Sequence, residues 1–290
     1  MSAARRVLVT GAGGRIGTAV VAELVARGTS VTALVLDPDD APAGADRVLA
    51  GDAADPGVVA RALDGADGVV HLAAIPSPLH DPPEVVFRTN TLATFTVLEQ
   101  AGRAGVRRAV VAGSQARSGL PFAPRPAHPA YVPADLDSPT QAADPYALSK
   151  VVDEQTAAAA ARRHGGTVVV LRYPLVGDAD RLAAFAAARA ADPAQGASDL
   201  WAYLDVRDAA VAAALALDVD EPGAHVVDVA APETLVPYVT GDLLARYHPD
   251  AEVRADLPGR AVPVDLGPAE RLLGFRARHL LDLGPLRPLP

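Results

Sequence analysis

The chain of 290 residues contains no cysteine, and it has only one lysine, one tryptophan and one methionine. The lack of cysteine excludes disulfide bonds, thiolate metal sites and a cysteine nucleophile. No apolar run approaches the roughly 20 residues of a membrane-spanning helix, and the N-terminus lacks the apolar segment of a signal peptide. We therefore expect a cytoplasmic protein without a membrane partner.

Acidic side chains outnumber basic ones, with 35 Asp and Glu against 26 Lys and Arg and a net charge of −9. Such a charge repels phosphate at long range and disfavours nucleic acid as a partner. Half of the residues are hydrophobic, enough to bury a large core. We therefore expect a globular protein that acts on a small molecule.

Short apolar runs alternate with helical patterns along the first two thirds of the chain. The expected strands are Val7–Thr10, Val31–Leu36, Val48–Ala50, Gly68–Leu72, Ala109–Ala112 and Thr167–Leu171. The expected helices are Arg15–Arg27, Pro56–Leu63, Glu84–Ala104 and Tyr146–His164. Strands that are almost entirely apolar predict a parallel sheet covered by helices on both faces, which is a doubly wound α/β fold.

Two later regions depart from this alternation. Seven prolines between Leu120 and Pro145 predict an irregular ordered loop, which is either a wall of the site or a plain surface excursion. After Arg172 the pattern is less regular, and we expect helices over Arg181–Ala190, Val206–Leu217 and Thr234–Tyr247.

A glycine-rich turn follows the first expected strand, with Gly11, Gly14 and Gly17 at a spacing of three. One glycine permits the tight turn, one lets the backbone approach a pyrophosphate, and one lets the helix pack on the strand. The spacing differs from G-x-G-x-x-G, because position 16 is Ile16, and an ordinary strand–helix turn is the alternative. Its place at the N-terminus, together with the motifs below, favours nucleotide binding.

Tyr146 and Lys150 stand one helical turn apart on the same face of an expected helix. Hydride transfer to a carbonyl leaves an alkoxide that needs a proton, and the reverse reaction needs a base. An ammonium beside a phenol, together with an oxidised nicotinamide, favours the phenolate, and Lys150 can also donate to ribose hydroxyls. Ser114, after the fifth expected strand, can donate to the substrate oxygen. A surface i, i+4 pair is the alternative for Tyr146 and Lys150.

With these motifs the chain resembles the extended short-chain dehydrogenase/reductases, the NAD-dependent epimerase/dehydratase family. The matching segments are Thr10-Gly11-x-x-Gly14-x-x-Gly17, Gly51-Asp52, His71-Leu72-Ala73-Ala74, Asn90, Tyr146-x-x-x-Lys150 and Leu171-Arg172-Tyr173-Pro174. The chain departs from the family at Ser118, where a tyrosine usually precedes the glycine. The resemblance implies a Rossmann-type cofactor-binding domain over residues 1–175, which carries the catalytic residues. It also implies a small substrate lobe over 176–290, interleaved with the last strands of the sheet.

The resemblance implies roles for the matching residues. Asp52 accepts from the adenine amino group beside Ala53, Ala73 and Ala74 pass under the riboses, and Tyr173 and Pro174 approach the nicotinamide. The whole expected cofactor set is Gly11, Gly14, Arg15, Ile16, Gly17, Asp37, Asp52, Ala53, Leu72, Ala73, Ala74, Asn90, Tyr146, Lys150, Tyr173 and Pro174.

The choice between NAD and NADP depends on the end of the second strand, where an acidic residue in this family selects NAD. Val35 holds that position here, and Asp37 follows two residues later with Asp39 and Asp40 behind it. Three carboxylates repel a 2′-phosphate, although Arg15 could approach one. We expect NAD, with NADP not excluded.

The substrate lobe lacks an arginine that nucleotide-sugar enzymes of this family use for the diphosphate, and Trp201 stands in its place. The chain length and the Gly113-Ser114-Gln115 step resemble uronate dehydrogenases. That resemblance implies a sugar acid or similar polar substrate held by Ser77, Ser114, Gln115 and Arg181, although Arg181 could equally be a solvated helix residue. His71 and His80 have no supporting cluster of ligands, so we expect no metal.

The predicted activity is NAD(P)-dependent interconversion of a secondary alcohol and a carbonyl on a sugar-derived or similarly polar molecule, with Ser114, Tyr146 and Lys150 as catalytic residues. The alternatives are a nucleotide-sugar epimerase or dehydratase with tightly bound NAD, and a non-catalytic NAD(P)-sensing protein. Dimers of this family pack through the two long helices, here Glu84–Ala104 and Tyr146–His164, and the Ala157–Ala161 run suits close helix packing. We therefore expect a homodimer.

Overall fold

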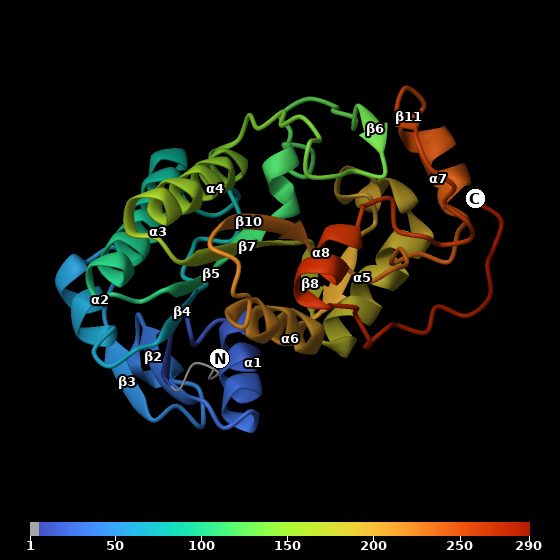
Figure 1. The fold of residues 1–290 in the computed structure, drawn as a ribbon. Helices are drawn as coiled ribbons and strands as arrows, with labels where there is room; N and C mark the ends of the chain where they lie inside the picture. Colours follow the sequence, from blue (N-terminus) through green and yellow to red (C-terminus); the bar gives the residue numbers. More distant parts are fainter. Residues whose placement is uncertain (1–5) are drawn as a thin grey trace.

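The computed structural model describes residues 6–290, which form a seven-stranded parallel sheet in the order β10-β7-β5-β4-β1-β2-β3 (Figure 1). In chain order its strands are β1 (Arg6–Thr10), β2 (Ser30–Val35), β3 (Arg47–Ala50), β4 (Gly68–His71), β5 (Arg108–Ser114), β7 (Thr167–Tyr173) and β10 (Gly223–Asp228). This is the doubly wound Rossmann-type sheet that the alternating apolar runs predict. Residues 1–5 of the predicted first domain lie outside the described residues.

Helices cover both faces of the sheet. Those of the described chain are α1 (Arg15–Ala26), α2 (Pro56–Ala62), α3 (Pro83–Arg103), α4 (Pro145–His164), α5 (Ala179–Ala191), α6 (Val206–Leu217), α7 (Thr240–Tyr247) and α8 (Gly267–Leu273). Val7 and Val9 of β1 join the core formed with α1 and α6, whereas Leu8 between them joins the core formed with α2, α3 and α4. Strand residues are apolar at successive positions because both faces are buried.

The strand order reverses between β1 and β4, and this position is where the glycine-rich turn lies. From β1 the chain proceeds outward through β2 to β3, and it then returns to β4 on the other side of β1. Loops that leave the carboxyl ends of β1 and β4 therefore diverge and leave a crevice between them, the usual place of a ligand in such sheets.

The second part of the chain contributes both to the sheet and to a separate lobe. β10 pairs with β7, and α6 packs on the sheet, whereas β8 (Leu175–Gly177) pairs with β9 (Tyr203–Asp205) outside it. The lobe has its own core, in which Trp201 is fully buried among residues near α7. The predicted division into a cofactor-binding domain and a substrate lobe, with its boundary at residue 175, stays an interpretation.

Two details differ from the expectations drawn from the sequence. The helix expected over Thr234–Tyr247 begins only at Thr240, because Pro237 offers no N–H and disfavours helical geometry in the residue before it. The preceding segment is held by the backbone instead, with the Leu235 N–H donating to the Trp201 carbonyl. The Pro-rich loop is irregular as expected, apart from β6 (Tyr131–Val132), which pairs with β11 (Glu252–Val253).

Candidate active site

The glycine-rich turn is closely packed against the loop that follows β4. Gly11 has a φ of +63°, and a Cβ at this position would lie 2.7 Å from the backbone nitrogen of Ala73. A Cβ on Gly17 would lie 2.2 Å from the carbonyl oxygen of Gly11. The turn therefore tolerates no side chain at either position.

The N-terminus of α1 is open to an anion. Gly14 is the N-cap, and within residues 6–290 no side chain caps this helix and no acidic residue lies in its first turn. The first helical hydrogen bond runs from Thr18 to Gly14, so the N–H groups of Arg15, Ile16 and Gly17 precede it. Free N–H groups and the positive end of the helix dipole fit a pyrophosphate, and the predicted turn residues come together here.

A buried threonine–histidine pair joins the ends of β1 and β4. Thr10 Oγ1 accepts from the N–H groups of Leu72 and Ala73 and lies 2.8 Å from His71 Nδ1, while His71 Nε2 lies 3.2 Å from Thr94 Oγ1. Burial and the positive charge of Lys150 lower the pKa of His71 to about 3. His71 is thus a neutral structural residue that fixes the loop carrying Leu72, Ala73 and Ala74. In residues 6–290 no group of three or more His, Cys, Asp or Glu is arranged to hold a metal ion.

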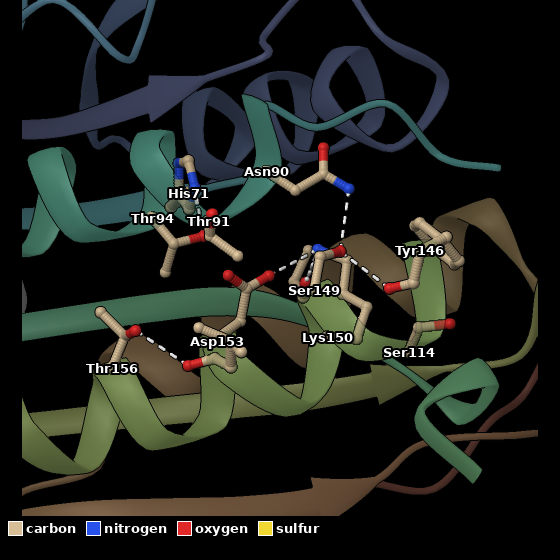
Figure 2. A network of polar contacts seen from close by, with 12 residues as sticks. His71, Asn90, Thr91, Thr94, Ser114, Tyr146, Ser149, Lys150, Asp153 and Thr156 are labelled. Atoms are coloured by element: carbon tan, nitrogen blue, oxygen red, sulfur yellow. Dashed lines mark hydrogen bonds and ion pairs between the residues drawn. The ribbon is translucent and has the colours of Figure 1, made fainter. Parts of the chain in front are cut away.

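The three predicted catalytic residues lie at the carboxyl edge of β5 and the first turns of α4 (Figure 2). The Tyr146 ring is almost buried, and the edge of Phe122 packs against it at 5.9 Å between centroids. Lys150 Nζ lies 5.8 Å from the centroid of the same ring. Ser114 Oγ accepts from the Ala116 N–H, which leaves its hydroxyl proton free to donate to a substrate oxygen.

Lys150 is deeply buried and has two fixed partners. Its ammonium donates to the Ala112 carbonyl of β5 at 3.1 Å and to Asp153 Oδ2 at 2.9 Å. Burial lowers the pKa of Lys150, but the charges of Asp153 and Tyr146 and the hydrogen bond that Lys150 donates to Asp153 outweigh it, so the pKa lies above the ordinary lysine value. Sequence reasoning missed Asp153, although its position three residues after Lys150 on the same helix was a usable signal.

Asn90 connects the loop after β4 to the catalytic helix. Its Oδ1 accepts from the Ile75 N–H at 2.8 Å, and its Nδ2 donates to the Ile75 carbonyl and to Ser149 Oγ, both at 3.1 Å. Ser149 Oγ in turn donates to the Tyr146 carbonyl at 2.7 Å. Asn90 thus positions α4, and a direct contact with the cofactor stays a prediction.

Tyr173 lies against α6 and not over the crevice. Its hydroxyl donates to the Ala209 carbonyl at 3.1 Å, and burial raises the pKa of this phenol. The ring shares the sheet face of Leu171 and Val169, as strand alternation requires. Only the backbone at the end of β7, and not the Tyr173 ring, is therefore placed to approach a nicotinamide. The predicted contact of Tyr173 and Pro174 with the nicotinamide stays a prediction.

An acidic turn borders the glycine-rich turn. Asp37 accepts from the Asp39 N–H at the start of η1 (Pro38–Asp40), and a Cβ on Gly13 would lie 2.5 Å from the Asp40 carbonyl oxygen. Arg15, the cation that could meet a 2′-phosphate, pairs with Asp178 at 3.4 Å. The surroundings of the expected ribose are thus dominated by carboxylates, which fits a cofactor without the extra phosphate.

The expected adenine contact is held by a local turn. Asp52 Oδ1 accepts from the Ala54 N–H at 2.8 Å, and Ala53 is buried in the core beneath α2 and α3. The exposed Asp52 carboxylate retains its second oxygen as an acceptor. Its bond to an adenine amino group stays a prediction.

A small cavity of about 60 Å³, lined by both polar and apolar residues, lies between η2 (Gln115–Ser118), the Pro-rich loop and the lobe. Gln115 lines it, and its Nε2 is buried without a hydrogen-bond partner in the described chain, as is Nε of Arg117. Asp199 and Asp228 also line it, and burial raises the pKa of each to about 6. Such a cavity suits water or a polar part of a substrate.

The other predicted substrate residues lie elsewhere. Ser77 Oγ accepts from the Leu79 N–H in the loop after β4. Arg181 is exposed on α5 with its guanidinium 5.0 Å from the centroid of the Phe185 ring, and it does not line the cavity. Contacts of Ser77 and Arg181 with substrate stay predictions.

A family model for the NAD-dependent epimerase/dehydratases matches residues 7–230. The chain belongs to this family. A 3-diazoavenalumate denitrifying reductase from a Streptomyces species is 34% identical over 95% of this chain and 90% of that protein. A UDP-glucose 4-epimerase from Azospirillum brasilense is 31% identical over 62% of this chain and 51% of its own length.

Solved structures show the same fold with cofactor bound. MoeE5 in complex with UDP-glucose and NAD is 28% identical, with a TM-score of 0.71 over 95% of this chain and 94% of that one. A short-chain dehydrogenase/reductase from Agrobacterium tumefaciens with bound NAD is 25% identical, with a TM-score of 0.70 over 96% and 94%. The chain is thus an NAD-dependent enzyme of the extended short-chain dehydrogenase/reductase type, and its glycine turn fits that cofactor. In residues 6–290 the structure contains no helix with the length and hydropathy to span a membrane.

Proposed function

We propose that this enzyme catalyses net NAD(H)-dependent interconversion of a secondary alcohol and a carbonyl on a polar small molecule. The observation that carries the proposal is the position of Ser114, Tyr146 and Lys150 at the same carboxyl edge of the sheet as the uncapped N-terminus of α1. The family relation alone leaves the substrate and the net reaction open.

NAD, held by the glycine turn and the loops after β2, β3 and β4, would supply or accept the hydride at the substrate carbon. In the reduction, the Tyr146 hydroxyl gives its proton to the oxygen of the carbonyl, and in the oxidation the phenolate takes it back. Ser114 donates a hydrogen bond to the same oxygen and stabilises its developing negative charge. The Lys150 ammonium supports the phenolate and has an N–H left for a ribose hydroxyl.

Two observations support a polar substrate outside the nucleotide sugars. The cavity beside Gln115 is lined by further polar side chains such as Ser118 and Gln141. Trp201 is fully buried and donates from Nε1 to the Pro193 carbonyl at 2.7 Å, so it brings no charge to a diphosphate. The relative that spans nearly the whole chain is named a reductase, which favours net redox chemistry.

The alternative is an epimerase or dehydratase that retains its NAD, favoured by the fold shared with MoeE5 bound to UDP-glucose and NAD. The catalytic trio would serve this reaction equally well, since it also begins with removal of a hydride and a proton. A non-catalytic NAD(P) sensor has no need of the trio.

One paired experiment separates these functions. Nucleotide released from purified protein is identified, and absorbance at 340 nm is followed with NAD(H) or NADP(H) against uronates, aldoses, hydroxy-ketones, 3-diazoavenalumate and UDP-sugars. We expect turnover with free cofactor, and kcat/KM at least about tenfold higher with NAD(H) because the carboxylates at Asp37–Asp40 repel a 2′-phosphate. Stoichiometric bound NAD with conversion of a UDP-sugar and no net redox change would contradict the proposal and establish the alternative.

We also propose that the enzyme is a homodimer formed through α3 and α4. A groove of about 500 Å³ runs between these helices and is lined by apolar residues such as Leu98, Val152 and Ala159. Phe95 is 56% exposed beside it, and Leu92 on the same helix is also exposed. A second copy could bury this surface by antiparallel packing of both helices.

The Phe95→Arg variant should therefore sediment as a monomer at concentrations where the wild type sediments at twice the mass of one chain. Leu280→Arg, an exposed apolar residue far along the chain, is the matched control and should remain dimeric. Sedimentation velocity makes the measurement, and a wild type with the mass of one chain would refute the dimer.

A further inference from the structure

The single lysine of the chain is placed where an ammonium is unstable without a counter-ion. Lys150 is 4% exposed, and its ammonium is held against β5 by the hydrogen bond to the Ala112 carbonyl. Taking a positive charge out of water favours the neutral amine. A neutral lysine could neither support a phenolate nor hold a ribose hydroxyl as a charged donor.

Asp153 supplies the opposite charge from one helical turn further along α4 (Figure 2). Its carboxylate is fully buried, its Oδ2 accepts from Lys150 at 2.9 Å, and its Oδ1 has no hydrogen-bond partner in the described chain. A carboxylate in this position is costly by itself, so its burial is explained by the ammonium beside it.

The other groups that face Lys150 do not replace Asp153. From the same helix Tyr146 has its ring 5.8 Å from Nζ, and the phenol is uncharged until it gives up its proton. His71 of β4 is neutral, because burial and the charge of Lys150 lower its pKa. The group that β5 contributes is the uncharged Ala112 carbonyl. Asn90 and Thr94 on α3 are uncharged (Figure 2).

We propose that Asp153 is a positioning residue that keeps Lys150 charged and fixed in the catalytic site. The Asp153 carboxylate accepts a hydrogen bond from one N–H of the ammonium, and the Ala112 carbonyl accepts from a second. The third N–H is left to donate to a cofactor hydroxyl. The hydrogen bond to a cofactor hydroxyl rests on the proposed function, whereas the charge on Lys150 does not. The carboxylate also restrains the side chain, so the ammonium points in one direction before a cofactor arrives.

Since the chain has one lysine, its charge can be read directly. Protein grown with ¹³Cε-lysine gives one side-chain resonance, whose shift is followed from pH 7 upward. The wild-type signal should not titrate below about pH 10.4, the ordinary lysine value, and Asp153→Asn should lower the midpoint by about one pH unit or more. Glu154→Gln removes a neighbouring, partly buried carboxylate of the same helix that pairs with Arg172, and it should leave the midpoint of the Lys150 titration unchanged.

An Asp153→Asn midpoint within about 0.3 pH units of the wild type would overturn the proposal. Asp153→Ser removes the same charge with a smaller side chain and decides the matter if the asparagine variant does not fold, as judged by circular dichroism. NADH affinity, measured by fluorescence from pH 7 to 10, should weaken with rising pH in Asp153→Asn well before it does in the wild type. If no protein binds NADH, the proposed function fails, while the lysine resonance still decides the role of Asp153.

Discussion

Replacement of Tyr146 by phenylalanine should lower kcat by about 10²- to 10⁴-fold, the usual contribution of a positioned general acid or base. The ring would still pack against Phe122 and fill its place beside Val86 and Ala116, so the fold should be preserved. Only the hydroxyl that exchanges a proton with the substrate oxygen is lost. The measurement is steady-state turnover, followed by absorbance at 340 nm with the substrate and cofactor that the paired experiment identifies.

NADH affinity provides the internal control for this variant. The glycine turn and the Lys150 ammonium are unchanged in Tyr146→Phe, so the dissociation constant should stay within about threefold of the wild type, a change of less than about 1 kcal/mol. A variant that keeps more than about a tenth of the wild-type kcat would show that another group moves the proton. Loss of NADH binding together with activity would instead point to a structural role of the hydroxyl.

The sheet could be predicted from the sequence because its strands up to β7 contain apolar runs, and most of them are followed by a helical pattern. The strand β10 (Gly223–Asp228) was not predicted, since its segment includes His225 among partly exposed residues. Its pairing with β7 depends on the whole edge of the sheet and not on its own residues. The late start of α7 was predictable in principle, because Pro237 lies inside the expected helix.

The candidate catalytic residues could be proposed from the sequence because each carries a type of chemistry at a recognisable spacing, and their roles stay predictions. The directions of neighbouring side chains were harder to foresee. Strand alternation could have placed the Tyr173 ring with Leu171, on the face that α6 covers. Nothing in the local sequence of Asn90 indicates that it binds the Ile75 backbone and Ser149, because these partners meet only in the folded chain.

The sequence indicated only part of the small cavity, since Gln115 was an expected substrate contact and the Pro-rich loop one candidate wall of the site, and both line it. Arg117 follows β5, Arg172 is the last residue but one of β7, and Asp228 ends β10, three elements that are well separated in the chain. They meet at one sheet edge, where Arg172 pairs with Glu154 at 2.7 Å and with Asp228 at 3.3 Å. The lining of this cavity thus depends on residues whose proximity is a tertiary property, whereas the spacing of Tyr146 and Lys150 is a local property of the sequence.

The Gly17→Ala variant should weaken NADH binding by about tenfold or more, because the added Cβ disturbs the turn that faces the cofactor. That atom would lie 2.2 Å from the Gly11 carbonyl oxygen and 2.8 Å from backbone atoms of Ala12. Backbone cannot move aside as a flexible side chain can, so α1 and the turn must separate. Overpacking of this kind also lowers the free energy of unfolding by about 1–3 kcal/mol. Fluorescence titration with NADH and thermal unfolding make the two measurements.

Gly241→Ala is the matched control, since both glycines lie in the first turn of a helix and carry ordinary φ angles. A Cβ on Gly241 meets no atom within 4 Å, and alanine is the better helix former by about 0.5–1 kcal/mol. This control should bind NADH like the wild type and unfold at the same or a higher temperature. If Gly17→Ala behaves in the same way, the tight contact between the turn and α1 is not needed for the cofactor. A large loss of affinity in Gly17→Ala alone would tie the cofactor to the backbone geometry of this turn, since the two substitutions add the same single methyl group.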